Sequence, residues 1–492
     1  MEETILESAF FLVVAIVSIA LIIVVSKQRQ QQKTVTTIPW APNAIPILGH
    51  ALKYRSNPGK FLLDTFEQVG EIFQINMAGK VMIVACGSHV QRAVASAPES
   101  ILSARQAVAD IGFEEMLGYL NVYKGTDVHK GIVKGLLHNR TTSSEQVVSG
   151  WIQSIQRSLK HETALNKEPQ KVDFMKFIRR VVLRVSIDQF IGAFFLEKDE
   201  CWEDGFDFIE VFMNFQDDLE DVTAKSVVLP RAAALPLLLW PLKRRRHRLQ
   251  QRISKRLEYV LKHNGSLEKY GFWLADLKDK FHPDEIAELI VGLLFAAHKN
   301  PAIGTAQSYL MLYEHATSDQ KQIILKESKA FISNPSIQES SYPTLNRLCL
   351  EALRLTAHSI GAVRTAQHDF PVETTNKQKY IIPKGATVAL THLSSSLNSE
   401  FWKEPHQMDL DGRPMESYQN DYMFTVFSHG IHKCPGHKLA MLVLHSTVAI
   451  LLVEYEIATL NPIPPLCFER ATLGQRAGPV YVTIRENDNQ EK

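Results

Sequence analysis

The sequence is poor in cysteine, and the cysteines that it has are scattered. It contains five among 492 residues and no Cys-x-x-Cys pair. This spacing argues against a disulfide framework and against a structural zinc site, and it suits a chain that folds in a reducing compartment. The five positions are Cys86, Cys201, Cys349, Cys434 and Cys467.

The sequence also lacks an excess of charge of either sign. It has 54 Lys and Arg residues against 53 Asp and Glu residues, a formal net charge of +1 at pH 7. The composition therefore indicates neither a nucleic-acid partner nor an acidic substrate. With 45% hydrophobic and 22% charged residues, the chain has the composition of an ordinary globular protein. Its length allows one large domain or two to three smaller ones.

An uninterrupted apolar run occupies residues 9–25, with Ser18 as its one polar residue. This length is near the lower limit for a transmembrane helix. Acidic residues precede the run, and Lys27, Arg29 and Lys33 follow it, so the positive-inside rule places the rest of the chain in the cytosol. We predict a single-pass anchor over residues 1–28. A cleaved signal peptide is the alternative, but the run lacks a basic leading segment and a convincing small-residue cleavage site.

Two further segments combine prolines with apolar residues. Residues 29–49 carry three prolines between positions 39 and 46, which predicts a stiff, extended linker. Residues 227–242 are strongly apolar, but their three prolines prevent a long helix, so they do not form a second span. The basic run Lys243–Arg248 follows and favours an interfacial contact with anionic lipid. A buried loop followed by a solvated basic helix is the alternative.

The most informative stretch is residues 427–436, which read Phe-Ser-His-Gly-Ile-His-Lys-Cys-Pro-Gly and precede an apolar helical run from Leu439 to Tyr455. Cys434 therefore stands near a helix N-terminus, whose partial positive charge and unpaired N–H groups favour an anionic sulfur. Gly430 and Gly436 would let the backbone pass close to a large flat object. The alternative is a buried cysteine in a helix-capping loop.

A long central helix is predicted over His282–Tyr313, because apolar residues recur there at helical spacing. Ala296 and Ala297 are small enough to allow the close approach of a flat cofactor. Pro301 removes a backbone N–H group, which predicts a kink and a carbonyl free to hold water.

Three shorter elements follow from local patterns. Residues 71–86 predict a β-hairpin around a turn at 78–80. Leu345–Leu355 predicts a helix with Glu351 and Arg354 on one face, a pair that would be worth little if exposed. Residues 380–388 predict strand, turn and strand.

These motifs stand in the order found in the cytochrome P450 superfamily. The order is membrane anchor, proline hinge, long helix, Glu-x-x-Arg pair, Tyr-x-Ile-Pro-Lys-Gly strand and Cys loop, and together they cover nearly the whole chain. The chain most resembles microsomal, sterol-oxidising and fungal members. The resemblance implies a mainly α fold with small β-sheets (α+β), an N-terminal transmembrane helix, and a haem-thiolate catalytic domain over residues 50–492.

The resemblance implies that the cofactor is haem b, with the Cys434 thiolate as the axial ligand of the iron. Arg364 and His432 would bind the haem propionates through charge-assisted pairs. Where the family usually carries Trp and Arg, this chain has His129 with Lys130 or Lys134, although a solvated basic helix face would explain these residues equally well. The implied cofactor-binding set is Cys434, Phe427, Gly430, His432, Gly436, Arg364 and Lys130.

In the family, the Glu-x-x-Arg pair is buried and is completed by a later arginine. Arg413 is the candidate here, so Glu351, Arg354 and Arg413 form the implied structural set. The fit is loose, because Pro414 follows where the family usually has Phe.

The resemblance places the oxygen-binding groove along the long helix, where this chain departs from the family. Lys299 stands at the usual acid position and Asn300 at the usual alcohol position. Asn can hold a water or donate to an oxygen ligand, but it cannot relay a proton as readily as Thr. Thr305 is a possible substitute or an ordinary helix-face residue. The implied catalytic set is Asn300, Lys299 and Thr305, and the implied substrate pocket is Phe295, Ala296, Ala297, Ser359 and Ile360.

The function implied is a membrane-anchored monooxygenase that hydroxylates or oxidises a lipophilic terpenoid, steroid or other secondary metabolite with dioxygen. Electrons would come from NADPH–cytochrome P450 reductase, or from cytochrome b5, at the endoplasmic reticulum membrane. Because Asn at the alcohol position also occurs in a branch that rearranges a peroxide, an isomerase or dehydratase that works without NADPH is the alternative. A non-enzymatic haem carrier is a third hypothesis, which the substrate helix and the basic Cys-loop face argue against.

Overall fold

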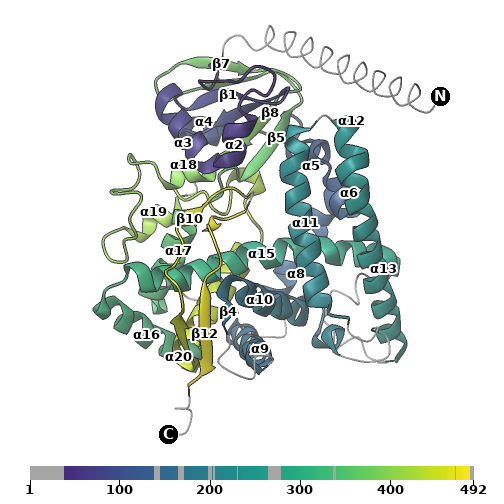
Figure 1. The fold of residues 1–492 in the computed structure, drawn as a ribbon, viewed down its shortest axis with the longest axis vertical. Coiled ribbons are helices and arrows are strands. Elements are labelled where there is room, and N and C mark those ends of the chain that lie inside the picture. Colours follow the sequence, from purple (N-terminus) through teal and green to yellow (C-terminus); the bar gives the residue numbers. More distant parts are fainter. Residues whose placement is uncertain are drawn as a thin grey trace, which may run out of the picture.

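The computed structural model describes residues 38–137, 144–164, 171–197, 202, 206–229, 231–263, 277, 279–335, 339–420, 422–470 and 472–487. The predicted anchor and the first part of the predicted linker lie outside these residues. The described residues are mainly helical, with four small sheets. The largest sheet lies at one end of the molecule, and helices make up most of the rest (Figure 1).

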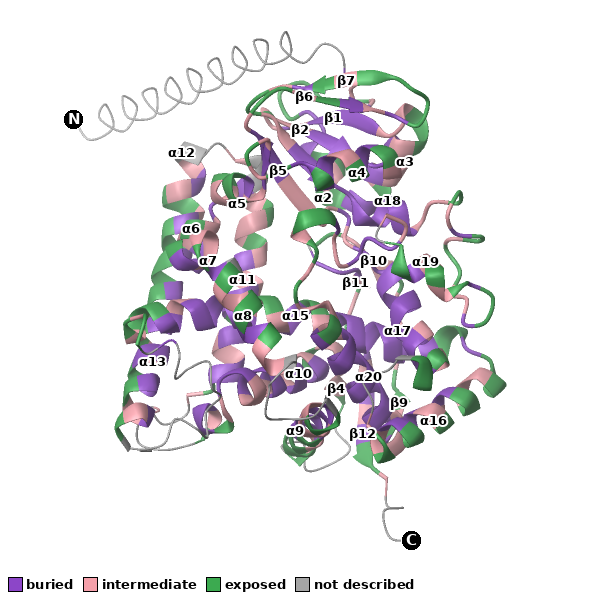
Figure 2. Cartoon of the chain, turned by 180° about the vertical axis from the view of Figure 1, so that it is seen from behind, coloured by how far each residue is buried: buried purple, intermediate pink, exposed green. Residues whose placement is uncertain are grey.

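The long helix α15 (Pro283–His315) runs through the middle of the molecule and matches the prediction within two residues at each end. Its start is fixed by Pro283 in the first turn and by the Glu285 side chain, which accepts a hydrogen bond from the His282 N–H at 2.9 Å. Its most extensive helix contacts are with α10 (Phe174–Phe190), α13 (Trp240–His263), α17 (Pro343–Leu355) and α20 (His437–Glu454). Helices α15, α17 and α20 are coloured as largely buried in Figure 2.

Two described helices, α15 and α20, are long and apolar enough to cross a membrane. In each, 67% of the apolar window is buried inside the protein. A helix that is apolar on all sides is suited to a protein core as well as to a bilayer. We therefore assign both helices to the core.

The predicted β-hairpin is confirmed as β1 (Ile72–Met77) and β2 (Lys80–Ala85), joined by Ala78 and Gly79, both at positive φ. It forms one side of a five-stranded sheet in the order β1-β2-β8-β5-β3. Strand β8 (Thr387–Leu390) pairs in parallel with β2, whereas β5 (Ala362–Ala366) and β3 (Leu102–Ser103) continue the sheet antiparallel.

The predicted strand–turn–strand at 380–388 is present as β7 (Lys379–Ile382) and β8, but the two strands belong to different sheets. Strand β7 pairs with β6 (Phe370–Glu373). The other small sheets are β4 (Val172–Asp173) with β12 (Tyr481–Glu486) and β9 (Tyr455–Thr459), and β10 (Leu466–Cys467) with β11 (Gln475–Arg476).

The described part of the predicted linker, residues 38–49, lies against β1 instead of extending away from the domain. Ile38 is buried, and its carbonyl accepts a hydrogen bond from the Gln74 side chain at 2.5 Å. Asn43 and Ile47 adopt positive φ (63° and 68°), so the chain turns here. Residues 38–49 are therefore docked on the edge of the sheet.

The prediction that the prolines of residues 227–242 prevent a long helix is wrong. Helix α11 (Phe208–Val228) ends within this segment, but helical structure then runs without a break from α12 (Arg231–Ala234) through a π-helical turn (Leu235–Leu239) into α13, which begins at Trp240. The chain continues as a helix through Pro236 and Pro241. Leu237 and Trp240 are 67% and 52% exposed. This corner therefore presents large apolar side chains to solvent, beside the basic start of α13.

Shorter elements complete the described chain around this core. They are α2 (Ala51–Ser56), α3 (Pro58–Val69), α4 (Ser88–Ser96), α5 (Ala104–Ile111), α6 (Phe113–Leu117), α7 (Tyr119–Tyr123), α8 (Gly125–Leu137), α9 (Ser144–Ala164), η1 (Ala193–Leu196), α16 (Ser318–Ser333), η4 (Glu339–Ser341), α18 (His392–Ser396), α19 (Met415–Gln419) and η5 (Gly430–His432).

Candidate active site

The Cys loop is a closed turn that ends at the N-terminus of α20. The Cys434 N–H donates to the Phe427 carbonyl at 2.8 Å, and Gly436 is the N-cap of the helix. Burial raises the pKa of the Cys434 thiol, against the opposite effect of a hydrogen bond from the Gly436 N–H. The effect of burial on the pKa of this thiol thus outweighs the effect of the hydrogen bond from Gly436.

Cys434 lines a cavity between its own loop and α15, with about 1060 Å³ of atom-free space that is partly open to solvent. Phe427 and Gly436 of the loop and Ala296, Ala297 and Asn300 of α15 line the same cavity, which joins two motifs far apart in the sequence. The remaining lining residues are His129, Val133, Trp151, Ser186, Phe190, Leu293, Pro301, Leu353, His358, Val426, Pro435, Leu439, Ala440, Val443, Leu444 and Leu473.

The two loop glycines have different reasons to be glycine. At Gly436, an added Cβ would meet no atom nearer than the Cys434 sulfur, 4.0 Å away, so the backbone stays open towards the cavity. Gly430 has φ +64°, and an added Cβ would lie 2.3 Å from the Ala95 carbonyl oxygen. The expectation that Gly430 makes room for a flat ligand is thus corrected, because the space that it leaves is taken by helix α4.

A cluster of charged side chains combines the predicted residues Arg364, His432 and Lys130. Arg364 lies on β5, is buried, and donates from Nη1 to the Val363 carbonyl at 2.8 Å. Its Nε and Nη2 find no hydrogen-bond partner among the residues that the structure describes. His432 Nε2 lies 3.2 Å from Glu99. Burial lowers the pKa of His432, and the charges of Arg364 and Lys130 lower it further. Glu99 was not predicted.

The α15 turn beside the cavity combines Asn300 with Pro301. Asn300 Oδ1 accepts a hydrogen bond from the Leu473 N–H at 3.3 Å. The helix continues through Pro301. The carbonyl freed by Pro301, that of Ala297, accepts a hydrogen bond from Ser186 Oγ at 3.2 Å. The carbonyl that was predicted to hold a water is therefore bound by the Ser186 hydroxyl group.

The other two predicted catalytic residues point elsewhere. Thr305 Oγ1 donates to the Pro301 carbonyl at 2.9 Å within the helix. The Lys299 side chain is buried, and its Nζ pairs with Asp217 at 2.6 Å and Glu220 at 2.5 Å on α11. Neither residue is among those that line the Cys434 cavity.

Three of the predicted substrate-pocket residues also lie outside the cavity. The Phe295 ring packs edge-on against Phe113, with centroids 6.3 Å apart. Ser359 and Ile360 line a different pocket, together with residues of α11. Only Ala296 and Ala297 of the predicted pocket share a cavity with Cys434. Local spacing could not reveal this, because it does not fix which side of the chain faces the cavity.

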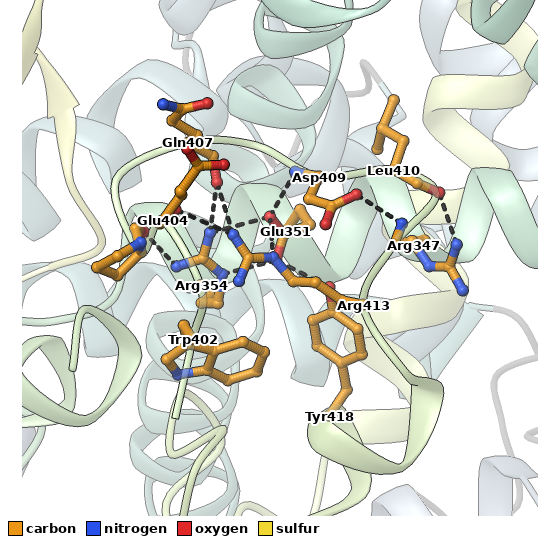
Figure 3. A network of polar contacts seen from close by, with 12 residues as sticks. Arg347, Glu351, Arg354, Trp402, Glu404, Gln407, Asp409, Leu410, Arg413 and Tyr418 are labelled. Atoms are coloured by element: carbon orange, nitrogen blue, oxygen red, sulfur yellow. Dashed lines mark hydrogen bonds and ion pairs between the residues drawn. The ribbon is translucent and has the colours of Figure 1, made fainter. Parts of the chain in front are cut away.

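The predicted Glu-x-x-Arg pair is buried, and its arginine binds Glu351 through two hydrogen bonds, Nε to Oε1 at 2.6 Å and Nη2 to Oε2 at 2.9 Å. Arg413 approaches the same carboxylate at 3.3 Å, as predicted. The Tyr418 hydroxyl donates to Glu351 at 2.8 Å. Figure 3 shows Trp402 beneath the two guanidinium groups, 5.1 Å and 5.6 Å from its ring centroid.

The sequence matches the family model of cytochrome P450 over residues 39–483. The chain belongs to the cytochrome P450 family. A sterol 14-demethylase of Arabidopsis thaliana is 23% identical to this P450 over 463 residues, which covers 87% of each chain. A sterol 14alpha-demethylase of Mycobacterium tuberculosis is 22% identical over 436 residues, 84% of this chain and 90% of that one. A beta-amyrin 11-oxidase of Glycyrrhiza uralensis is 28% identical over 206 residues, 38% and 39% of the two chains.

Membership implies a haem iron cofactor, and the residues present in this P450 fit one. The cavity exposes the Cys434 sulfur and the open side of Gly436. Arg364 holds two buried donor nitrogens without a partner among the described residues, which suits an anionic group. Among the described residues, no group of three His, Cys, Asp or Glu side chains could hold a metal ion. A single thiolate is the ligand set that a P450 haem iron takes from its protein.

Several residues that line the P450 cavity belong to no recognisable sequence pattern. His358 and Leu473 come from separate parts of the chain and carry no motif. His129 was considered only for the cofactor edge, but it lines the cavity, and its Nε2 donates to the Leu289 carbonyl at 3.1 Å. Burial lowers the pKa of His129.

Proposed function

We propose that this P450 is a membrane-anchored monooxygenase that hydroxylates or oxidises a lipophilic small molecule of the steroid or terpenoid class. The observation that carries the proposal is the shared cavity, in which the Cys434 sulfur and Asn300 stand among mainly apolar side chains. Such a lining favours an apolar substrate. The names of the relatives, two sterol demethylases and a beta-amyrin 11-oxidase, support the same class.

The proposed cofactor is haem b, held by Cys434, with Arg364 and His432 at its propionates and Phe427 beside the sulfur. When bound, the haem supplies the activation of dioxygen and the transfer of one oxygen atom to the substrate. Asn300 uses its Oδ1 to bind the Leu473 N–H, which leaves its amide N–H groups to donate to an oxygen ligand or a water. The apolar lining excludes bulk water and orients the substrate.

The proposed domain organisation is an anchor over residues 1–28, a linker over 29–49 and the catalytic domain over 50–492, on the cytosolic side of the endoplasmic reticulum membrane. The exposed Leu237 and Trp240 support a second membrane contact. Lys243 and Arg244 follow directly and are exposed, a combination suited to the surface of an anionic bilayer. Substrate would then reach the cavity from the membrane.

The proposed electron donor is NADPH–cytochrome P450 reductase, with cytochrome b5 as a second candidate. Lys433, His437 and Lys438 give the Cys-loop face a basic character, which suits an acidic partner. The competing hypothesis is a rearrangement that needs no NADPH. The relatives reported above are named as demethylases and an oxidase, which favours oxidation.

The test is product formation in membranes that contain the full chain, with isotopically labelled dioxygen and a panel of sterols, triterpenes and diterpenes. Each substrate is incubated with and without NADPH and reductase, and the Cys434→Ser variant is run in parallel. We expect NADPH-dependent products that carry one labelled oxygen atom and are absent with the variant. Conversion without NADPH, or without label, would replace the proposal by the rearrangement.

A further inference from the structure

The α15 turn directly before Asn300 is held in place by side chains of two neighbouring helices. Gln216 of α11 donates from Nε2 to the Phe295 carbonyl at 3.1 Å, and its side-chain oxygen lies 2.5 Å from His298 Nδ1. His298 Nε2 donates to the Arg179 carbonyl of α10 at 3.0 Å. The turn is therefore fixed from outside as well as by its own backbone.

Pro301 explains why this turn depends on outside support. Proline has no N–H group, so the hydrogen bond that would run back to the Ala297 carbonyl is missing from the helix. Instead, the Ser186 hydroxyl of α10 donates a hydrogen bond to that carbonyl. A helix that lacks one of its own bonds bends more easily at that point. The position of Asn300, the residue before the proline, therefore depends on how α10 and α11 hold the turn.

Lys299 adds two ion pairs to these contacts. Its ammonium is bound by Asp217 and Glu220, and Arg179 binds the same Asp217 carboxylate through two N–H groups at 2.9 Å and 3.1 Å. The four charges balance as two cations and two anions. A buried ammonium is tolerated only with such partners. At the position where the family resemblance implies an acid, this chain thus has a cation, and α11 supplies the acids.

The two carboxyl groups depend on Lys299 to different degrees. Burial works to raise the pKa of both. Lys299 and Arg179 outweigh burial at Asp217, whose pKa is lowered. At Glu220, the pKa stays raised despite Lys299. Asp217 keeps Arg179 if Lys299 is removed, whereas Glu220 loses its ion-pair partner. The Lys299–Glu220 pair is therefore the contact to perturb.

We propose that Lys299 is a positioning residue for the oxidation: by binding Asp217 and Glu220, it fixes the α15 turn against α11 and so sets where Asn300 stands in the cavity. This inference rests on the proposed function, in which Asn300 acts beside the cofactor. Lys299 itself is not among the residues that line the cavity. Its effect reaches the site through the backbone of its neighbour.

The experiment compares full-length variants in membranes. Lys299→Met removes the charge and keeps the length, and Lys299→Arg keeps the charge. The double variant with Lys299→Glu and Glu220→Lys exchanges the pair. Lys225→Met is the matched control, because Lys225 forms an exposed pair with Asp221 on the same helix α11. The measurements are haem content, product per NADPH consumed, KM and kcat, and backbone hydrogen exchange over residues 208–228.

We expect Lys299→Met to keep its haem but to lose up to about tenfold in product per NADPH and in kcat, because misplacing Asn300 costs at most the hydrogen bond that Asn300 makes in the cavity. KM should change little, and exchange over residues 208–228 should become faster. Lys299→Arg and the exchanged pair should restore both properties, and Lys225→Met should behave as wild type.

Wild-type coupling and wild-type exchange in Lys299→Met would overturn the proposal. Loss of haem in Lys299→Met that neither Lys299→Arg nor the exchanged pair restores would also overturn it, because the residue would then be purely structural. If the wild-type chain forms no NADPH-dependent product, the proposed function fails. The exchange measurement then decides by itself whether Lys299 fixes α11, and unchanged exchange would overturn that too.

Discussion

The Glu351 carboxylate binds two guanidinium groups, those of Arg354 and Arg413, at a place where its own side chain has no exposed surface. Tyr418 donates a further hydrogen bond to it. Because the site is buried, water cannot replace a lost partner. Removal of the carboxylate charge therefore leaves two buried cations without their counter-charge.

Glu351→Gln keeps the shape of the side chain but removes this charge. We expect the free energy of unfolding to fall by roughly 3–5 kcal/mol, the usual range when one partner of a buried ion pair is lost. Urea unfolding followed by circular dichroism measures the change. Asp64→Asn is the control, because Asp64 pairs with Lys60 on an exposed surface and should cost less than about 1 kcal/mol. Equal losses in the two variants would refute the buried network.

Cys434→Ser should remove the thiolate signature of the reduced, CO-bound protein, because a serine hydroxyl is not a thiolate ligand. Cys467→Ser is the matched control, since Cys467 lies on β10, away from the cavity lining. The reduced CO spectrum and the haem content of both variants decide the matter. A thiolate-type band in Cys434→Ser would mean that another residue is the ligand.

Arg364→Met removes two buried donor nitrogens, Nε and Nη2, for which the described residues provide no hydrogen-bond partner. We expect the rate of haem dissociation to rise roughly tenfold to a hundredfold, since a hydrogen bond to a charged group contributes about 1.5–3 kcal/mol. Transfer of haem to an apoglobin acceptor measures the rate. Arg157→Met removes an arginine whose side chain is 62% exposed and should have no effect. Unchanged transfer from Arg364→Met would show that the cluster does not hold the cofactor.

Asn300→Ala and Thr305→Val separate two residues of one helix. Asn300 lines the cavity, whereas the Thr305 hydroxyl is used within the helix by the Pro301 carbonyl. We expect Asn300→Ala to lower product per NADPH by up to about tenfold, the effect of one hydrogen bond, with normal haem content. Thr305→Val should keep wild-type coupling. The opposite result would mean that Thr305, and not Asn300, binds the oxygen ligand or its water.

The proposed membrane contact at the start of α13 can be measured in a chain that lacks residues 1–28. Such a chain should still bind vesicles that contain anionic lipid, and Leu237→Ser with Trp240→Ser should weaken that binding, because both side chains are exposed apolar groups. Ile381→Ser removes a similarly exposed apolar side chain (56%) on β7 and serves as control. Sedimentation with vesicles gives the bound fraction. Equal binding by all variants would place the contact elsewhere.

Local patterns in the sequence were sufficient for most of the fold that surrounds the site. The ends of α15, α17 and α20 lie within about two residues of those predicted from apolar spacing, and the β1–β2 hairpin follows its turn residues. Glu351 with Arg354, and Arg364, were found through motifs of fixed spacing. Such features are encoded within a few neighbouring positions.

What the sequence could not provide was the direction in which α15 residues face. Lys299 and Asn300 are neighbours, yet one binds α11 and the other lines the cavity. The partners of Lys299 lie about 80 positions earlier, at Asp217 and Glu220, with no local signal to connect them. No local signal connects Glu99 to His432 either. Nor does one connect Gly430 to Ala95, whose carbonyl leaves no room for a side chain at position 430. Packing between distant segments decided each case.

The parallel pairing of β2 with β8 has a consequence for synthesis. Ala85 of β2 pairs with Leu390 of β8. Strand β2 can therefore pair with β8 only after about 300 further residues have been synthesised, which takes roughly 15–60 s at ribosomal rates of about 5–20 residues per second. During that time an apolar strand, Val81 to Ala85, has an open edge that another chain could pair with. Nascent chains of this protein should therefore need a chaperone at that edge until the second half has emerged.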